Sequence, residues 1–259
     1  MSQSMRSAET PKSSGAVGEI IEIVKTVVYA LLIALFLRVI FFQPFTIPSA
    51  SMEPNLYEGD YIIVSKWSYG YSRHSIPFSP RLFEGRILAS APARGDVVVF
   101  KLPSDGHTDY VKRLVGLPGD RMQVTGGVLS VNGRPVTRTP AGTGPASCPY
   151  GAQETSSRFT ETMINGRSFN TNDCGPAPDD NTAVFTVPEG HYFMMGDNRD
   201  NSSDSRVDPL AGGVGYVPAE NLVGKAQIVL LSWHPGASIF KPWTWVLDAR
   251  PSRFAKILK

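Results

Sequence analysis

Two serines in a stiff segment are the first residues whose types and spacing suit chemistry. The segment IPSASMEP places Ser49 and Ser51 between Pro48 and Pro54. Each proline fixes its own φ angle and restricts the residue before it, so the two hydroxyls have little conformational freedom. A serine held in this way suits the role of a nucleophile, provided that a base takes its proton and a donor stabilises the oxyanion that follows.

The candidate base is a lysine. None of the histidines has an obvious orienting carboxylate, and they occur in unrelated contexts as His74, His107, His191 and His234. Lys112, in DYVKRLV, shares one face of a predicted strand with Tyr110 and Leu114. Apolar neighbours disfavour the charged form of a lysine, so its neutral amine becomes available as a base. For an isolated lysine, an exposed side chain whose stem covers apolar surface is the simpler interpretation.

A third polar stretch, GHYFMMGDNRDNSSDSR, carries more carboxylates and hydroxyls than a core needs. Asp200, Ser202 and Asp204 alternate as the ligands of a calcium loop do, but Ser205 and Ala211 stand where that loop needs glycine and glutamate. Taken alone, the stretch is interpreted as a polar surface turn. The scattered histidines and the cysteines match no zinc spacing, so we expect no metal and no cofactor.

The two cysteines allow two interpretations. Cys148 and Cys174 form a disulfide if the region after residue 43 lies outside the cytoplasm, because oxidising compartments preserve such bonds. Two unpaired thiols are the alternative.

The bulk composition excludes some classes of protein. The 259 residues are 42% hydrophobic, which is enough for a packed core and argues against a disordered chain. The formal net charge is +2, so no global field favours nucleic acid as a partner. The 24 glycines and 21 prolines predict many turns, as in a strand-rich fold.

A single apolar run near the start predicts a membrane anchor. Residues 19–42 read EIIEIVKTVVYALLIALFLRVIFF, and from Thr26 onwards only Arg38 interrupts the apolar character. The run reaches the ~20 residues that a bilayer core requires. Basic residues precede it, so the positive-inside rule places the N-terminus in the cytoplasm and the remainder on the opposite side of the membrane.

A cleavable signal peptide that ends at Ala50 is the rival interpretation of this run. Pro48 would then occupy the third position before the cut, where a small side chain is required. The apolar run also exceeds the usual length of about 7–15 residues. An uncleaved anchor is therefore favoured.

Short strands bounded by turns dominate the remaining sequence. Segments such as YIIVSK, DVVVFK, HYFMMGD and LVGKAQIVLLSW alternate with RGD, LPGD and PEG turns. The predicted fold class is mainly β, with an antiparallel sheet or barrel-like catalytic domain after one transmembrane helix. The expected division begins with a cytoplasmic tail (residues 1–18) and a transmembrane anchor (19–43). The catalytic β core follows in two parts (44–136 and 182–259), separated by a loop-rich excursion (137–181).

The C-terminal segment mixes aromatic and basic residues. Its aromatic members are Trp233, Phe240, Trp243, Trp245 and Phe254. Tryptophan beside cations suits the headgroup layer of a bilayer, and ordinary packing against the sheet is the equally simple alternative.

Three blocks together, IPSASMEP, DYVKRLVGLPGD and GDNRDNSSDSR, resemble the motifs of bacterial type I signal peptidases. Their order, their position after an N-terminal anchor and the β-rich sequence between them are also similar to that family. The resemblance covers residues 19–231 in outline. It implies a membrane-bound serine endopeptidase that removes signal peptides from secreted preproteins after small residues, in the Ala-x-Ala sense.

Matching residues carry the family's roles onto this chain. The resemblance implies that Ser51 is the nucleophile and Lys112 the general base. Ser49 and the Ser51 backbone N–H form the implied oxyanion hole. Ser202 resembles the serine that orients the lysine amine, and Asp204 and Arg206 resemble the charged pair that braces this loop.

The resemblance implies two partners, the signal-peptide region of exported preproteins and the lipid bilayer, with no nucleic acid and no metal. An extended peptide would bind as an added strand. Specificity for small residues requires shallow apolar pockets, and the residues in or near the matching strands that are expected to line them are Phe45, Ile47, Met52, Leu56, Ile62, Val99, Tyr110 and Val111.

Two alternatives belong to other classes of function. One is a membrane-anchored scaffold in which Ser51 and Lys112 are inert. The other is a serine/lysine protease that cleaves itself, although no DNA-binding module precedes the site as in self-cleaving repressors.

Overall fold

The N-terminal helix is long and apolar. The computed structural model describes residues 15–149, 155–237, 241 and 243–258. Helix α1 (Ala16–Ile40) contains the stretch Val17–Ile40, which has a mean hydropathy of 2.4 and could cross a membrane by length and composition. The helix ends at Ile40, before the predicted boundary at residue 43. Strand β1 (Phe42–Thr46) follows almost at once, and it contains Pro44, which lacks the N–H that a helix would need. The chain divides into two compact units, Met1–Arg38 and Val39–Lys259.

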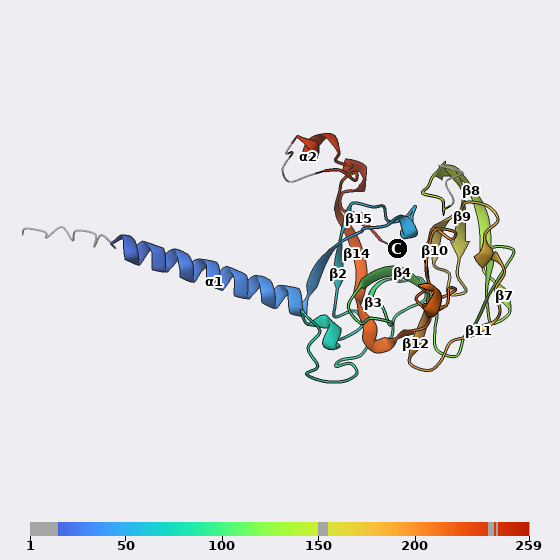
Figure 1. The fold of residues 1–259 in the computed structure, drawn as a ribbon, viewed down its shortest axis with the longest axis horizontal. Coiled ribbons are helices and arrows are strands. Elements are labelled where there is room, and N and C mark those ends of the chain that lie inside the picture. Colours follow the sequence, from blue (N-terminus) through green and yellow to red (C-terminus); the bar gives the residue numbers. More distant parts are fainter. Residues whose placement is uncertain (1–14, 150–154, 238–240, 242, 259) are drawn as a thin grey trace, which may run out of the picture. The chain divides into compact units, whose positions relative to one another are not determined.

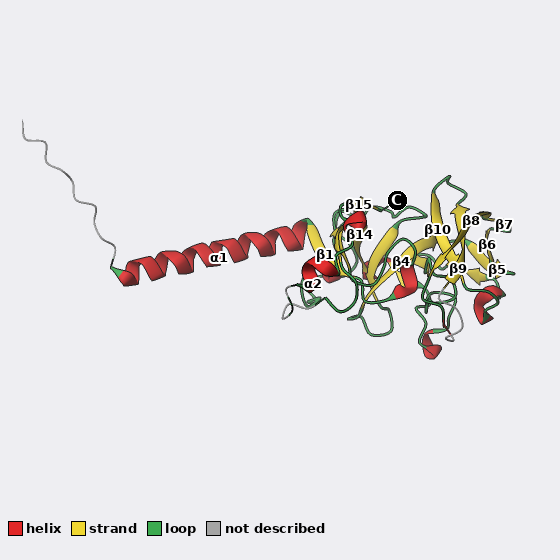
Figure 2. Cartoon of the chain, turned by 90° about the horizontal axis from the view of Figure 1, so that it is seen from above, coloured by secondary structure: helices red, strands yellow, loops and turns green. Residues whose placement is uncertain are grey.

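The second unit is built on one antiparallel sheet, which confirms the predicted mainly-β fold. The strands follow the order β1, β2, β14, β3, β4, β12 and β13, with β15 added to β14. Figures 1 and 2 draw the strands as arrows and label most of them. Their bounds after β1 are β2 (Asp60–Ser65), β3 (Val97–Lys101), β4 (Asp109–Gly116), β12 (His191–Met195), β13 (Val217–Pro218), β14 (Leu222–Ser232) and β15 (Lys256–Ile257). The central strand β3 reads VVVFK and is buried on both faces, as β-branched runs in covered sheets are.

Two smaller sheets are inserted between β4 and β12. One has the order β11, β5, β6 and β7, and the other the order β10, β9 and β8. Their bounds are β5 (Arg121–Thr125), β6 (Val128–Val131), β7 (Arg134–Pro135), β8 (Thr137–Pro145), β9 (Thr155–Thr162), β10 (Ser168–Asp173) and β11 (Phe185–Thr186). Residues 137–181 thus contain more regular structure than the loop-rich sequence predicts.

Three apolar clusters hold these sheets together. One lies around Ile47, Ile62 and Val229 of the main sheet, and a second around Phe100 and Leu114. The third joins the inserted sheet to β12 and is formed by Val115, Met122, Val124, Leu129, Val131, Val136, Met163, Phe169, Val187, Phe193 and Met195. Full burial of such side chains stabilises a fold by about 1.5–3 kcal/mol each, so the inserted sheet is fixed firmly against the strand that follows it.

Short helical turns connect the strands. They are η1 (Ala50–Met52), η2 (Arg73–Ser75), η4 (Pro178–Asp180), η5 (Pro209–Ala211), η6 (Ala219–Asn221), α2 (Thr244–Leu247) and η7 (Pro251–Arg253). The C-terminal aromatic residues differ in their surroundings: some pack against the sheet and others are exposed. Trp233 packs against Tyr61 and Phe254, whereas Trp243 and Trp245 are exposed. Phe240 lies outside the described residues.

Candidate active site

The serine segment lies in the connection between β1 and β2, which we call the serine turn. Ser49 is extended, with φ −145° and ψ 158°, and η1 follows it. Backbone hydrogen bonds close the turn at its base, because Ile47 N donates to Asp60 O at 2.8 Å and Gly59 N donates to Ile47 O at 2.9 Å. Ser51 is 8% exposed and lies at the wall of a cavity. The local sequence therefore presents one hydroxyl on a turn held by the sheet.

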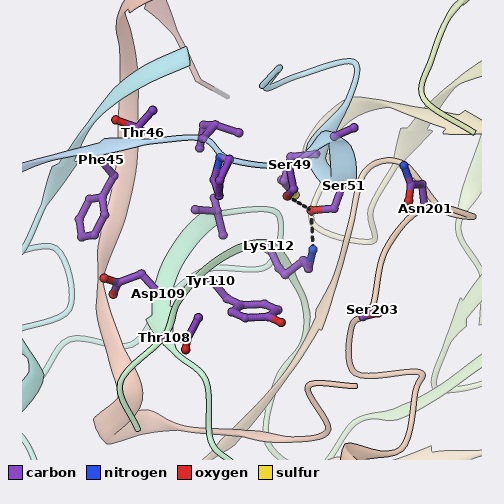
Figure 3. A pocket seen from close by; sticks show the side chains of 15 residues that line it. Phe45, Thr46, Ser49, Ser51, Thr108, Asp109, Tyr110, Lys112, Asn201 and Ser203 are labelled. Carbon is purple, nitrogen blue, oxygen red and sulfur yellow. Dashed lines mark hydrogen bonds between the residues drawn. The ribbon is translucent and has the colours of Figure 1, made fainter. Parts of the chain in front are cut away.

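Lys112 reaches this hydroxyl from β4. Its backbone pairs with Val98 of β3, and its side chain is 3% exposed. Lys112 Nζ donates a hydrogen bond of 2.5 Å to Ser51 Oγ, and the Tyr110 ring centroid lies 5.8 Å from the amine (Figure 3). Burial lowers the pKa of Lys112 to about 8 from its ordinary 10.5. A substantial share of this lysine is therefore neutral under mildly alkaline conditions.

A buried ion pair between Asp204 and Arg206 lies close enough to Lys112 to affect its pKa. Arg206 Nε donates to Asp204 Oδ1 and its Nη2 to Asp204 Oδ2, both at 2.9 Å. Burial alone would raise the pKa of Asp204, but Arg206 and the N–H of Gly196 hold it below its ordinary value. Desolvation is the largest influence on the pKa of Lys112 and lowers it, while the Asp204 charge raises this pKa and the Arg206 charge lowers it.

The two serines of the turn lie side by side. Ser49 Oγ is 3.4 Å from Ser51 Oγ, and Figure 3 shows both hydroxyls on the side of the turn that faces Lys112. A hydroxyl beside a nucleophile can donate to the oxygen that becomes negatively charged during attack. The geometry thus brings together the three residues expected to act on the carbonyl.

Ser202 differs from its expected contact. Its Oγ is buried and has no hydrogen-bond partner among the described residues, so the predicted bond to the Lys112 amine is not formed in this structure. The side chain nevertheless lies next to the site, because a Cβ placed on Gly196 would be 2.3 Å from Ser202 Oγ and 2.6 Å from Ser51 O.

The third block contributes residues that the sequence interpretation did not single out. Asn198 N donates to Ser51 O at 3.1 Å, and its Nδ2 donates to Ala50 O at 3.3 Å. Gly196 allows this approach because any larger residue would meet the nucleophile's backbone. The glycine and asparagine of GDN gave no distinct signal in the sequence, because both residues are also common in polar surface turns.

Arg113 and Asp197 link β4 to the same block. Arg113 donates to both carboxylate oxygens of Asp197 at 2.7 Å, and both side chains are buried. Such a bidentate pair is geometrically specific. It fixes the strand that carries Lys112 against the block that contacts Ser51.

The disulfide interpretation of the cysteines matches the structure, in which Cys148 and Cys174 are bonded. The residue before Cys148 touches the site from two directions. Ser147 N donates to Glu53 Oε2 at 2.9 Å, and Ser147 O accepts hydrogen bonds from Asn198 Nδ2 at 2.9 Å and Asn201 Nδ2 at 2.8 Å. The disulfide therefore tethers a segment that bridges the nucleophile turn and the third block.

The cavity beside Ser51 has a volume of about 630 Å³. Five of the residues predicted to line apolar pockets border it: Phe45, Ile47, Met52, Tyr110 and Val111. The structure corrects the prediction for the other three, Leu56, Ile62 and Val99, which are fully buried in the core behind the cavity. Ile62 lies in β2 and Val99 in β3, whereas Leu56 lies in the connection before β2, and all three side chains face the core.

Two strand edges face this cavity. Among the described residues, β1 pairs only with β2, and residues 109–112 of β4 pair only with β3. Unpaired strand edges offer backbone donors and acceptors to an extended peptide. No group of three or more metal-ligating side chains occurs in the part of the chain that the structure describes.

The chain is similar in sequence to known proteins. Residues 20–233 match the family described as "Signal peptidase, peptidase S26". The signal peptidase I of Rickettsia prowazekii (strain Madrid E) is 40% identical over 250 residues, covering 89% of this chain and 90% of its own. That of Rickettsia felis (strain ATCC VR-1525 / URRWXCal2) is 43% identical over 215 residues, covering 79% and 77%. A crystal structure of a signal peptidase I from Enterococcus faecalis V583 shares 24% identity, covers 52% of this chain and 97% of its own, and has a TM-score of 0.31.

Proposed function

Since the chain belongs to the signal peptidase family, peptidase S26, and is thus a serine peptidase that cleaves signal peptides, we propose that Ser51 is its nucleophile and Lys112 its general base. The observation that carries this proposal is the 2.5 Å contact between Lys112 Nζ and Ser51 Oγ, made by a lysine that is 3% exposed. Membership of a peptidase family contradicts the scaffold hypothesis, in which both residues are inert.

The reaction begins with proton transfer. The neutral Lys112 amine takes the proton of Ser51 as the oxygen attacks the scissile carbonyl, and the resulting ammonium protonates the departing amine. The lysine, neutral again, then activates a water that hydrolyses the acyl-enzyme. Because burial already lowers the pKa of Lys112 to about 8, returning the amine to its neutral form costs little near neutral pH. No cofactor takes part.

The negative charge that develops on the oxygen of the scissile carbonyl must be stabilised by hydrogen-bond donors. Ser49 Oγ and the Ser51 backbone N–H are the proposed pair, and the 3.4 Å separation of the two hydroxyls supports this role. Ser202 is the proposed partner of the lysine amine in the complex with substrate, since catalytic hydrogen bonds often tighten only then. Asp204 and Arg206 hold the loop that carries Ser202.

The proposed substrate is a signal peptide with small residues before the cleaved bond, of the Ala-x-Ala type. An extended peptide can pair with the free edges of β1 and β4, which places its side chains against Phe45, Ile47, Tyr110 and Val111. These bulky residues leave shallow pockets, and a large side chain next to the cleaved bond would collide with them.

We infer that α1 anchors the enzyme in the bacterial inner membrane, with the N-terminus in the cytoplasm and the catalytic unit on the outer face. The apolar stretch of α1 supports a single span. The Cys148–Cys174 disulfide supports an oxidising compartment for the catalytic unit.

Cleavage of a preprotein by the detergent-solubilised full chain tests the proposal. Ser51→Ala and Lys112→Ala should each lower kcat/KM at least about 10⁴-fold, whereas Ser130→Ala, in β6 of the inserted sheet, should leave it unchanged. A tryptophan in place of the alanine before the cleaved bond should also prevent cleavage. Either variant retaining wild-type activity while folded would refute the assignment. Mass spectrometry of the enzyme itself in the same assay distinguishes self-cleavage.

A further inference from the structure

A loop outside the active site exposes large apolar side chains to solvent. We call residues 76–90, between η2 and β3, the apolar loop; Figure 1 draws it in teal. Phe78 is fully exposed, Leu82 is 72% exposed and Leu88 78%, with Ile87 half exposed between Arg86 and Leu88. Soluble surfaces rarely gather apolar side chains in this way, and those that do mark a site of interaction.

The chain holds this loop in place. Arg86 donates four hydrogen bonds to backbone carbonyls, those of Tyr69, Gly70, Ala219 and Leu222. Tyr71 and Ile87 exchange backbone hydrogen bonds of 2.8 and 2.7 Å. Phe78 and Leu88 adopt left-handed backbone conformations, with φ of 66° and 52°, which bulky residues avoid unless the surroundings impose them. Their outward orientation is therefore built into the fold.

The base of the loop lies where the chain leaves the candidate membrane span. Tyr71 Oη donates a hydrogen bond of 2.7 Å to the carbonyl of Ile40, the last residue of α1. Trp67, just before the loop, packs its ring against Phe41 and Phe42, with centroids 6.0 and 4.5 Å away. All of these residues belong to the second unit. Tryptophan next to the end of a span is typical of a bilayer interface.

We propose that the apolar loop inserts into the outer leaflet of the bilayer, with Phe78, Leu82 and Leu88 at the boundary between headgroups and acyl chains. This inference rests on the proposed membrane anchorage. Ile40 marks the depth at which the helix ends, and the contact with Tyr71 puts the loop at a similar depth. The exposed Arg81 lies within the loop and suits anionic headgroups.

Insertion would give the catalytic unit a second attachment to the membrane besides α1. A single flexible connection leaves a domain free to rotate, whereas two attachments restrict its orientation. Strand β1 runs directly from the end of α1 to the turn that carries Ser51. The loop would therefore keep the cleft at a fixed distance from the membrane surface, where the cleavage region of a bilayer-embedded signal peptide emerges.

Depth measurement in pure lipid tests the proposal. The full chain is reconstituted in phosphatidylethanolamine–phosphatidylglycerol vesicles with a fluorophore on Phe78→Cys, and separately on Leu210→Cys in η5, which is 99% exposed but outside the loop. The native cysteines are paired, so only the introduced thiol reacts. Lipids carrying a nitroxide near the headgroup should quench the label at position 78 and spare that at position 210. Equal quenching would overturn the proposal, and quenching at position 78 only in native membranes would indicate a protein partner instead.

Activity separates this proposal from the proposed function. The triple variant Phe78→Ser/Leu82→Ser/Leu88→Ser should cleave a short peptide in detergent at the wild-type rate, and a vesicle-embedded preprotein about tenfold more slowly. Equal rates of the variant and the wild type on both substrates would overturn the loop's role. Failure of the proposed function would appear differently, as a wild-type protein that cleaves neither substrate.

Discussion

At the level of single residues, the buried amine of Lys112 determines how the site behaves with pH. Its surroundings combine desolvation, which lowers its pKa to about 8, with the opposing charges of Asp204 and Arg206. The lysine must be neutral to accept a proton from Ser51. Activity and stability therefore depend on the same ionisation, and both are favoured when the buried amine is neutral.

The first prediction concerns the pH dependence of kcat/KM. Since the neutral amine is the active form, kcat/KM should rise as the pH increases through about 8 and level off above it. Asp204→Asn removes a charge that raises the pKa of Lys112, so the rise should move to lower pH. Initial rates on a peptide substrate between pH 6 and 10 measure both effects. A flat profile would be inconsistent with Lys112 as the base.

The second prediction concerns stability. The shift of the Lys112 pKa from 10.5 to about 8 means that burying the charged amine costs roughly 3 kcal/mol. This cost is complete below the folded pKa and disappears as the pH rises toward the unfolded value. Lys112→Met should therefore abolish activity and raise the free energy of unfolding by about 1–3 kcal/mol at pH 7, with a smaller gain at pH 10. Denaturant unfolding at the two pH values measures this, and an equal change at both would contradict the argument.

At the level of elements, three separate segments meet at Ser51, the proposed nucleophile. The turn after β1 presents Ser51, β4 presents Lys112, and the block after β12 supplies Asn198 and the Asp204–Arg206 pair. The Arg113–Asp197 pair connects the second segment with the third. The close approach of the third segment to the first depends on the missing side chain of Gly196.

The third prediction follows from that approach. In Gly196→Ala the new Cβ would lie 2.6 Å from the Ser51 carbonyl oxygen, a backbone atom that cannot move away cheaply. Overpacking of this kind costs about 1–3 kcal/mol, and it should separate Asn198 from Ser51 and lower kcat. Gly144→Ala is the matched control, because its Cβ meets only the guanidinium group of Arg158. Thermal unfolding and steady-state kinetics test the pair, and similar losses in both variants would count against the contact.

At the level of the whole molecule, an apolar helix and a disulfide-containing β unit belong to different environments. The stretch Val17–Ile40 is exposed along its length, and the second unit contains its own cores. Under the proposed topology, hydrocarbon covers the helix, and the disulfide of the second unit suits an oxidising aqueous compartment.

The fourth prediction concerns topology. The full chain should remain with membranes during extraction at alkaline pH, as an integral span does. Protease added outside spheroplasts should digest the catalytic unit and leave a tag on the N-terminus protected, because basic residues precede the span. A protected catalytic unit with a digested tag would reverse the proposed orientation.

Much of this protein followed from its sequence. The apolar run predicted α1, and the alternation of apolar residues predicted the antiparallel β fold, because both patterns arise locally from backbone geometry. The strands β8, β9 and β10 escaped prediction, since their serines, threonines and glycines lack apolar alternation and are paired by hairpin contacts instead. The candidate residues Ser51 and Lys112 could also be identified from the sequence, because a serine between two prolines and a lysine in an apolar strand suit a nucleophile and a base.

Only the tertiary structure decided what surrounds those residues. Ser51 and Lys112 are 61 positions apart, and their contact depends on how the sheet brings the turn after β1 against β4. Leu56, Ile62 and Val99 were expected to line the cleft because they lie in or near the matching strands, but position along the chain does not show whether a side chain borders a cavity or lies in the core, where the structure has all three. Burial, the lowered pKa of the lysine and the approach of Asn198 are all properties of packing between distant segments, and no local pattern encodes them.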